Sequence, residues 1–369
     1  MNVPFVDLKT QYQGIKEEVL KEINDVLDNT AYICGKKAKK FEEDFAKIHE
    51  VKHSIGLSTG TDALHVAMHA LGIKQGDEVI VPVNTYIATA EGVSLCYAKP
   101  VFVDNDEKTY NIDINKIEAA ITPNTKAIIP VHLYGQPAEM DTILDIAKKH
   151  NLHVVEDCSQ AHLATYKGKK IGSFGVIGTF SFYPGKNLGA YGEGGAVTTN
   201  DDKLYDFMYK YRQHGSIEKY IHEIEGHNYR LEEIQAGVLN VKMKYIQKWT
   251  DMRRNNAKLY SETFASLGIE EVVTPWHPEY TDPVYHLYII RVKNREKLIE
   301  HLNKNGVQNG LHYPLPLHMQ KAYAHLGYKP EDFPVARKFA DEILSIPMYP
   351  EMTAEMIGYV CSTIKKFYS

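Results

Sequence analysis

The chain has 369 residues, of which 44% are hydrophobic and 24% are charged, and its formal net charge is -5. These values are ordinary for a soluble globular protein, and the length suits one large domain with a smaller companion. A mildly acidic balance without a dense Lys/Arg run argues against nucleic acid as a partner, and no apolar run approaches the roughly 20 residues that span a bilayer.

Two helices are expected first, and an alternation of strands and helices follows them. Apolar residues at helical spacing predict a helix over 11–28, and a shorter helix is expected near 36–49. Short apolar runs predict strands at 53–58, 77–82, 99–104, 126–132, 152–157, 178–184 and 194–200. Amphipathic segments predict helices at 61–72, 85–98, 113–121 and 140–150. This pattern indicates an α/β fold in which helices cover a central, mostly parallel sheet of about seven strands.

The pattern becomes helical beyond residue 200, through 201–213 and a long run over 230–267. A shorter α+β region follows, with its clearest strand at 285–292 and a final helix near 352–366. We place the domain boundary inside the long helical run. The sequence thus predicts a large α/β domain over 1–250 and a smaller C-terminal α+β domain over 251–369.

Candidate binding residues follow the strands, because ligands of open α/β sheets bind beyond the carboxyl ends of the strands. Gly60 and Thr61 open a helix whose free N–H groups can hold a phosphate, although a capped helix start is a common alternative. Tyr86 lies at the same edge, where a half-buried packing aromatic is the alternative. Asp157 ends a buried strand and needs a partner, either the turn that it caps or a cationic cofactor nitrogen. Gln160 offers an amide one turn further on.

Lys186 lies after Ser181 in the glycine-rich segment "SFYPGKNLGAYGEGGAVTTN", where a solvated surface lysine is the alternative. The segment is not a Walker A loop, because Phe180 and Asn187 stand where that loop requires glycine and Ser or Thr. A phosphate cradle, a flat aromatic, a carboxylate and a lysine at the strand ends of one sheet together meet the needs of pyridoxal 5'-phosphate (PLP). We therefore predict PLP as the cofactor.

Several segments resemble those of a known family. They are "VPFVDLKTQY", "TGTDAL", "EDCSQAH", "SFYPGKNLGAYGEGGA", "GHNYRLEEIQAG" and "HYPLPLH". Together they resemble the nucleotide-sugar aminotransferases of the DegT/StrS type, which have the aspartate-aminotransferase fold (PLP fold type I). The resemblance covers essentially the whole chain.

The resemblance implies a role for each candidate residue. Lys186 would form the Schiff base with PLP, and Asp157 would pair with the ring nitrogen, which makes both catalytic. Tyr86 would stack on the ring, and Gln160 would contact the cofactor near its 3-hydroxyl. The residues implied to bind the phosphate are Gly60, Thr61, Ser181 and, from the other subunit, Asn228.

The resemblance also implies a homodimer with shared active sites, because Asn228 would reach the partner's cofactor. On the sugar-nucleotide side it implies Tyr183, His312, Tyr313 and His318. Tyr183 and Gly185 are typical of family members that aminate C-3 of the sugar, whereas C-4 enzymes often read "SFHPVK". The implied reaction transfers an amino group from L-glutamate to a dTDP-3-keto-6-deoxyhexose, in the making of a deoxyamino sugar for a surface glycan.

Three alternatives remain at this point. The product is expected in the glucose series, dTDP-3-amino-3,6-dideoxy-glucose, but its galactose epimer stays open. A non-catalytic PLP-fold sensor would not need Lys186, and a sugar dehydratase on the same scaffold would carry His in its place. The sequence fixes neither the C-4 configuration nor the nucleotide base.

The cysteines and histidines predict no metal site. Cys34, Cys96 and Cys158 are scattered along the chain with Cys361, and no C-x-x-C pair occurs, which favours a reducing cytoplasm over a disulfide framework. The start "MNVPFVDLKTQYQ" lacks the features of a signal peptide, so we expect a cytoplasmic protein. His65 and His69 have a spacing that can hold a metal, but Val66 stands where the H-E-x-x-H motif needs glutamate, and the cysteines lie elsewhere in the sequence.

Overall fold

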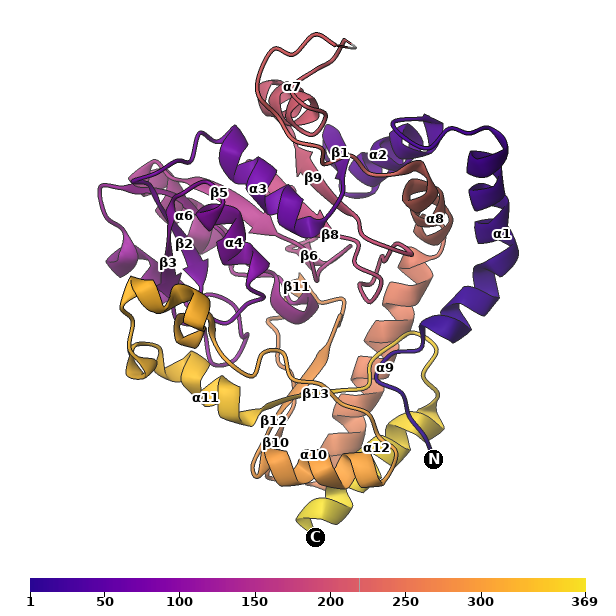
Figure 1. Ribbon diagram of the computed structural model, residues 1–369. Helices are drawn as coiled ribbons and strands as arrows, with labels where there is room; N and C mark the ends of the chain where they lie inside the picture. Colours follow the sequence, from indigo (N-terminus) through magenta and orange to yellow (C-terminus); the bar gives the residue numbers. More distant parts are fainter. Residues whose placement is uncertain (219) are drawn as a thin grey trace.

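The computed structural model describes residues 1–218 and 220–369. Its centre is a seven-stranded sheet (Figure 1). The strands are β1 (His53–Leu57), β2 (Glu78–Pro82), β3 (Lys99–Val103), β4 (Thr125–Ile128), β5 (His153–Asp157), β8 (Ile177–Ser181) and β9 (Gly195–Thr199). Their order is β1-β9-β8-β5-β4-β2-β3, and β9 alone of these runs antiparallel to its neighbours, β1 and β8. The prediction of a mostly parallel seven-stranded sheet is confirmed.

Helices surround this sheet and extend beyond it. They are α1 (Leu8–Asp28), α2 (Lys36–Ile48), α3 (Gly60–Ala70), α4 (Ala88–Ser94), α5 (Ile114–Ile117), α6 (Met140–His150), α7 (Asp202–Tyr211), α8 (Glu233–Met243), α9 (Ile246–Leu267), α10 (Arg295–Lys304), α11 (Pro334–Glu342) and α12 (Ala354–Tyr368). The helical run expected over 230–267 is two helices. Lys244 N–H donates to Val241 and Tyr245 N–H donates to Lys242, which is the tighter bonding of a closing helical turn.

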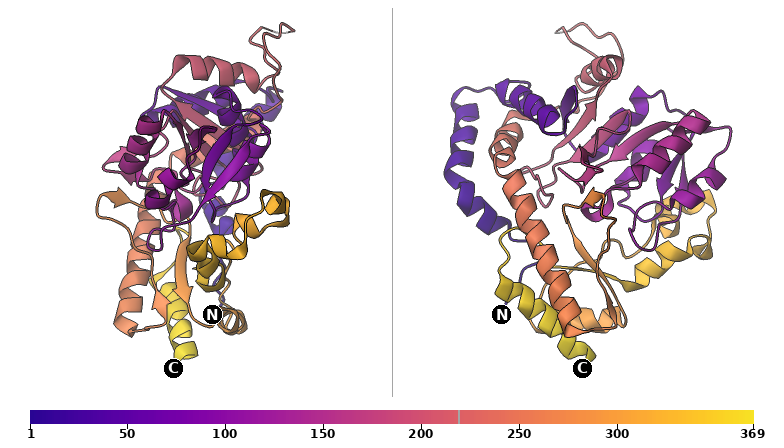
Figure 2. Two further views of the ribbon diagram at one scale, coloured as in Figure 1. Left: turned by 90° about the vertical axis from the view of Figure 1, so that its left-hand side faces the viewer. Right: turned by 180° about the vertical axis from the view of Figure 1, so that it is seen from behind.

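The two faces of the sheet are covered by different helices. Because side chains alternate along a strand, Val79, Val81 and Val155 pack with α3 and α4 on one face. Ile80 and Val154 pack with α6 on the other face. On that face, α2 and α8 cover β8 and β9 (Figure 2). Both faces are buried, and the strands therefore read as continuous apolar runs.

A second hydrophobic core lies in the C-terminal part of the chain. It is built on α9, α10, α12 and a three-stranded sheet of β10 (Val272–Val273), β12 (Tyr288–Val292) and β13 (Ile343–Ile346). Trp249 of α9 packs against α1, and Tyr260 packs in the C-terminal core, so one helix serves both regions. Val3 also enters this core, through a parallel bridge to Val307. Both chain ends lie on this side of the molecule, opposite α7 (Figures 1 and 2). The division at residue 250 stays a prediction.

One small sheet was not expected. It has the order β11-β6-β7 and is made of β6 (Thr165–Tyr166), β7 (Lys169–Lys170) and β11 (Thr281–Asp282). Strands of two residues carry no period that a sequence can reveal. No helix in the described part of the chain has both the length and the apolar character needed to cross a bilayer.

Candidate active site

Lys186 follows a tight turn at the end of β8. Its N–H donates to the carbonyl of Tyr183 at 2.8 Å, which places Pro184 and Gly185 at the two central positions of the turn. The chain then passes close beneath this turn, because a Cβ at Gly189 would lie 2.3 Å from the carbonyl oxygen of Pro184. The backbone at Gly189 therefore packs against the turn, and Lys186 lies beyond Ser181, the last residue of β8.

The environment of Lys186 changes the acidity of its amine. Burial lowers the pKa of Lys186 from 10.5 to about 8, and the negative charge of Asp157 opposes this shift. A larger fraction of this amine is neutral near neutral pH than for an ordinary lysine. The neutral form is the nucleophile that condensation with an aldehyde requires.

Asp157 is a buried carboxylate at the end of β5, 4% exposed. The hydroxyl of Thr89 donates to it at 2.8 Å and the N–H of Ser159 donates at 3.1 Å. Within residues 1–218 and 220–369, no Lys, Arg or His side chain forms an ion pair with it. Because two neutral donors do not compensate a buried charge, the site suits a ligand that brings a cation, such as a protonated ring nitrogen.

The start of α3 lies directly against the end of β8. A Cβ on Gly60 would lie only 2.6 Å from the Cβ of Ser181, so this approach requires glycine. The helix is capped by Thr59, whose hydroxyl accepts from the N–H of Asp62 at 3.0 Å. The N–H groups of Gly60 and Thr61 have no acceptor inside the helix, as in any first helical turn. With the Ser181 hydroxyl they form a cradle that suits a phosphate.

Two tyrosines with neighbouring rings, Tyr86 and Tyr313, belong to the candidate site. Tyr86 is 57% exposed, and its ring centre lies 5.9 Å from that of Tyr313. Gln160 Nε2 donates to the hydroxyl of Tyr313 at 3.0 Å, and Gln160 Oε1 accepts from the N–H of Tyr134 at 2.6 Å. The Gln160 amide thus joins two parts of the protein, and its contact with the cofactor stays a prediction.

His312 and Tyr183 also belong to this region. Burial, reinforced by the charge of Lys186, lowers the pKa of His312 to about 4, which keeps its ring neutral at physiological pH. Its Nδ1 lies 2.7 Å from the hydroxyl of Ser345. Tyr183, three residues before the lysine, is 56% exposed and open to a ligand.

Two of the expected site residues lie outside this cluster. His318 is buried, with its ring 4.8 Å from that of Phe333 and its Nε2 3.4 Å from the carbonyl of Pro330. This packing gives His318 contacts within the protein, and its contact with the substrate stays a prediction. Asn228 is exposed near the end of α7, where it pairs with Gln213 at the base of the loop that projects beyond this helix (Figure 1).

Sequence reasoning missed two residues that support the site. Thr89 reaches Asp157 from α4, and its position one turn after Tyr86 was the signal that could have revealed it. Asn187 Nδ2 donates to the carbonyl of Val284 at 3.1 Å, and its Oδ1 lies 3.3 Å from Nδ1 of His286. The residue next to the lysine therefore anchors the turn to the segment that precedes β12.

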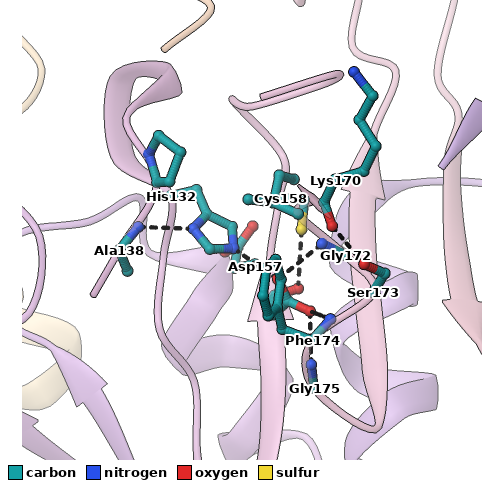
Figure 3. A network of polar contacts seen from close by, with 12 residues as sticks. His132, Ala138, Asp157, Cys158, Lys170, Gly172, Ser173, Phe174 and Gly175 are labelled. Atoms are coloured by element: carbon teal, nitrogen blue, oxygen red, sulfur yellow. Dashed lines mark hydrogen bonds and ion pairs between the residues drawn. The ribbon is translucent and has the colours of Figure 1, made fainter. Parts of the chain in front are cut away.

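Glu156, the residue before Asp157 in β5, lies at the centre of a network of hydrogen bonds. Figure 3 shows the surroundings of this network, with His132, Gly172 and Phe174 among the labelled residues. The Glu156 carboxylate accepts from the N–H groups of Gly172, Phe174 and Gly175 at 2.7–2.8 Å, and from His132 Nε2 at 3.1 Å. His132 Nδ1 accepts from a backbone N–H at 3.0 Å, so Nε2 carries the proton that Glu156 receives. Burial alone would raise the pKa of Glu156, but these donors outweigh it and lower the pKa. The carboxylate next to Asp157 is thus fully satisfied.

Comparison with known proteins places the chain in a family. Residues 13–365 match the DegT/DnrJ/EryC1/StrS aminotransferase family. The chain belongs to this family. It is a PLP-dependent sugar aminotransferase, and the predictions of family, fold, enzyme class and cofactor are confirmed.

Several relatives cover almost the whole of this aminotransferase. A "Pleiotropic regulatory protein" of Geobacillus stearothermophilus is 46% identical over 100% of this chain and 99% of its own length. The dTDP-3-amino-3,4,6-trideoxy-alpha-D-glucose transaminase of Streptomyces venezuelae is 43% identical over 99% of this chain and 96% of its own length. The dTDP-3-amino-3,6-dideoxy-alpha-D-galactopyranose transaminase of Aneurinibacillus thermoaerophilus is 43% identical over 99% of both chains.

Solved structures extend the likeness to three dimensions. DesV of S. venezuelae in complex with a ketimine intermediate has a TM-score of 0.97 and 41% identity, covering 99% of this aminotransferase and 98% of DesV. NtdA of Bacillus subtilis with bound cofactor PMP, the aminated form of PLP, has a TM-score of 0.92 and 32% identity, covering 98% of this chain and 84% of NtdA.

Proposed function

We propose that this aminotransferase moves an amino group from L-glutamate to C-3 of dTDP-3-oxo-6-deoxy-glucose, giving dTDP-3-amino-3,6-dideoxy-glucose. Transamination is supported by one pair of residues. The pKa of Lys186 is lowered, and the nearby carboxylate of Asp157 is buried with its charge uncompensated. The choice of C-3 rests on the "FYPGK" segment and on two relatives whose names both specify a 3-amino sugar.

The residues of the chain would divide the work as follows. PLP, when bound, supplies an aldehyde that condenses with amines and a ring that accepts electrons. Nζ of Lys186 would hold the cofactor and, once released, remove the α-proton of L-glutamate. In the second half-reaction the same amine would deliver a proton to C-3 of the sugar. Asp157 would keep the ring nitrogen protonated, and Gly60, Thr61 and Ser181 would bind the phosphate.

Other residues would serve the aromatic ring and the sugar nucleotide. Tyr86, more than half exposed, would stack on the cofactor ring. Tyr183, His312 and Tyr313 would line the sugar side, and Gln160 would act by holding Tyr313. Asn228, exposed near the end of α7, would reach the phosphate in a second subunit, so we propose a homodimer with shared sites.

The test is a parallel assay of sugars. Purified protein with PLP and L-glutamate is given dTDP-3-oxo-6-deoxy-glucose, its galactose epimer and the corresponding UDP sugars, and the products are read by mass. We expect the fastest amination with the first substrate. Faster turnover of the galactose epimer would move the assignment to dTDP-3-amino-3,6-dideoxy-galactose. Lys186→Ala should give no turnover, and full activity in that variant would overturn the mechanism.

A second candidate is a sensor that binds PLP or a sugar nucleotide without turnover. It is favoured by the name of the Geobacillus relative, a regulatory protein. The lowered pKa of Lys186 opposes it, because a pure binder has no use for an amine that is readily neutral. Conversion of the bound cofactor by L-glutamate, with release of 2-oxoglutarate, separates the two, since a sensor would leave L-glutamate unchanged.

A further inference from the structure

A cluster of nitrogen and sulfur ligands lies between α3 and the segment that follows α4. His65 and His69 project from α3, one turn apart, and Cys96 follows the end of α4. One ligand atom from each of these side chains lies within 4.8 Å of the others. His65 and Cys96 are each 6% exposed, whereas His69 is exposed and gives access from solvent.

Cys96 reaches the histidines because α3 and α4 approach closely. A Cβ on Gly92 of α4 would lie 2.7 Å from the Cβ of Leu64, so the contact between the two helices depends on glycine. Cys96 lies four residues after Gly92 and therefore on the same side of that segment. The sequence placed the cysteines apart from His65 and His69, and that expectation is wrong for Cys96.

Neighbouring side chains prepare His65 for a ligand role. Its Nδ1 lies 3.0 Å from the hydroxyl of Tyr229, which leaves Nε2 as the ring nitrogen for a metal. An orienting hydrogen bond on the second nitrogen is the usual arrangement of a metal-binding histidine. His227 lies next to this pair, with its ring centre 5.5 Å from that of His65 and 4.9 Å from that of Tyr229.

We propose that His65, His69 and Cys96 bind a divalent transition metal of the zinc type, with His227 or a water molecule in the fourth position. Zinc bonds of about 2.1 Å to nitrogen and about 2.3 Å to sulfur place tetrahedral ligands about 3.5 Å apart. Side-chain movements of about one ångström would bring this set to that geometry. The metal would join α3 to the segment that follows α4 and, with His227 as the fourth ligand, to the segment that carries His227.

The protonation state of His65 favours this site, whereas that of Cys96 opposes it. Burial, with the nearby His227 and His69, lowers the pKa of His65 to about 4, so its ring is neutral at physiological pH. Burial raises the pKa of Cys96 to about 11, and metal binding would therefore displace the thiol proton into solvent. Nothing is oxidised or reduced in this step.

A second group of metal-ligand type provides an internal contrast. His132, Glu156 and Cys158 also place ligand atoms within 4.8 Å of one another. Both ring nitrogens of His132 and both oxygens of Glu156 are engaged in hydrogen bonds within the protein (Figure 3). Because these nitrogen and oxygen atoms are already hydrogen-bonded, we do not propose a metal at that group. The His65 group differs because His65 Nε2 and the Cys96 sulfur have no hydrogen-bond partner in the described part of the chain.

The experiment uses the untagged full chain with PLP bound, freed of metals by dialysis against a chelator and titrated with Co²⁺. We expect one equivalent per chain to give visible d–d bands and a thiolate-to-cobalt charge-transfer band, both abolished by Zn²⁺. Cys96→Ser should lose the charge-transfer band, while Cys34→Ser, at an exposed cysteine, should keep it. A charge-transfer band that persists in Cys96→Ser, or no stoichiometric binding in the parent protein, would overturn the proposal.

Two further variants keep the test decisive if Cys96→Ser does not fold. His69→Ala changes an exposed side chain and should weaken Co²⁺ binding at least about 10-fold, whereas His325→Ala, an exposed histidine elsewhere, should not. Tyr229→Phe removes the hydroxyl that orients His65 and should weaken binding roughly 10–100-fold. Unchanged affinity in His69→Ala would contradict the site. Bound PLP, read by its absorbance, reports folding in every case.

Discussion

Glu156 and Asp157 are consecutive residues of β5 whose carboxylates lie on opposite faces of the sheet. Glu156 receives four hydrogen bonds from the protein, whereas Asp157 receives two and faces Lys186. Both are buried, so the difference lies in how far each charge is compensated. The saturated carboxylate holds the strand end in place, and the unsaturated one remains available to a ligand.

Asp157→Asn should lower the pKa of Lys186 below about 8 in the protein without cofactor, because the charge of Asp157 opposes the effect of burial. An amine reacts when neutral, so Lys186 of the variant should react at lower pH than in the parent. Reductive methylation over a pH series, read by peptide mass spectrometry at Lys186, measures this. Asp145→Asn, at an exposed aspartate of α6, is the control and should change nothing. If the midpoint pH for methylation of Lys186 is unchanged or higher in Asp157→Asn, the interaction between Asp157 and Lys186 is contradicted.

Glu156→Gln should reduce the free energy of unfolding by about 2–4 kcal/mol, because an amide NH2 would face N–H donors. The pKa of Glu156 is lowered in the folded protein, so its contribution is present above the ordinary glutamate pKa of about 4.3 and is lost as pH falls through the folded value. The stability difference between parent and variant should therefore shrink in acid. Urea unfolding at neutral and acidic pH measures it, with Glu17→Gln, at an exposed glutamate of α1, as control. A difference independent of pH would falsify the role of the charge.

Gly60→Ala should weaken PLP retention at least about 10-fold and cost about 1–3 kcal/mol of stability, because the new Cβ would overlap Ser181. Dialysis followed by the absorbance of bound PLP gives the first quantity, and thermal unfolding gives the second. Gly358→Ala is a matched control in α12, where a Cβ meets nothing within 4 Å. That change should stabilise by about 0.5–1 kcal/mol. Normal PLP retention in Gly60→Ala would argue against the cradle.

Asn228→Ala and Lys186→Ala subunits should each be inactive alone and should recover activity when mixed and reassembled. If sites are shared, one hybrid site carries Lys186 from one subunit and Asn228 from the other. Turnover of the mixed sample, compared with each variant incubated alone, measures the recovery. Its absence, with hybrid dimers verified by mass, would show that each subunit builds its site without Asn228 of the partner.

The strand ends could be predicted from the sequence because their signals are local. Apolar runs closed by Asp157 and Ser181 define where buried strands meet a ligand, and the parallel sheet brings such ends to one edge. The positions of Gly60 and Lys186 relative to the strand ends are then enough to predict that both lie at the ligand-binding edge of the sheet. The resemblance to a family added roles to these residues, which no periodicity could supply.

The remaining features depend on contacts between distant segments. Thr89 reaches Asp157 across 68 residues, and Cys96 reaches His65 only because Gly92 admits close helix packing. His318 is polar and belongs to a family motif, yet it packs against Phe333 because that segment folds back on itself. The packing of His318 could therefore not be predicted from its motif alone.

The pairing of β1 with β9 has a consequence for how the chain folds. His53 pairs with Thr199, and Val3 pairs with Val307, so both cores join segments that are synthesised far apart. Contacts of such long sequence separation slow folding, because the intervening chain must be ordered before they form. Until β9 emerges from the ribosome, β1 and the edge of β8 expose unpaired backbone to other chains. The nascent protein therefore passes through an interval of aggregation risk that ends only when β9 is in place.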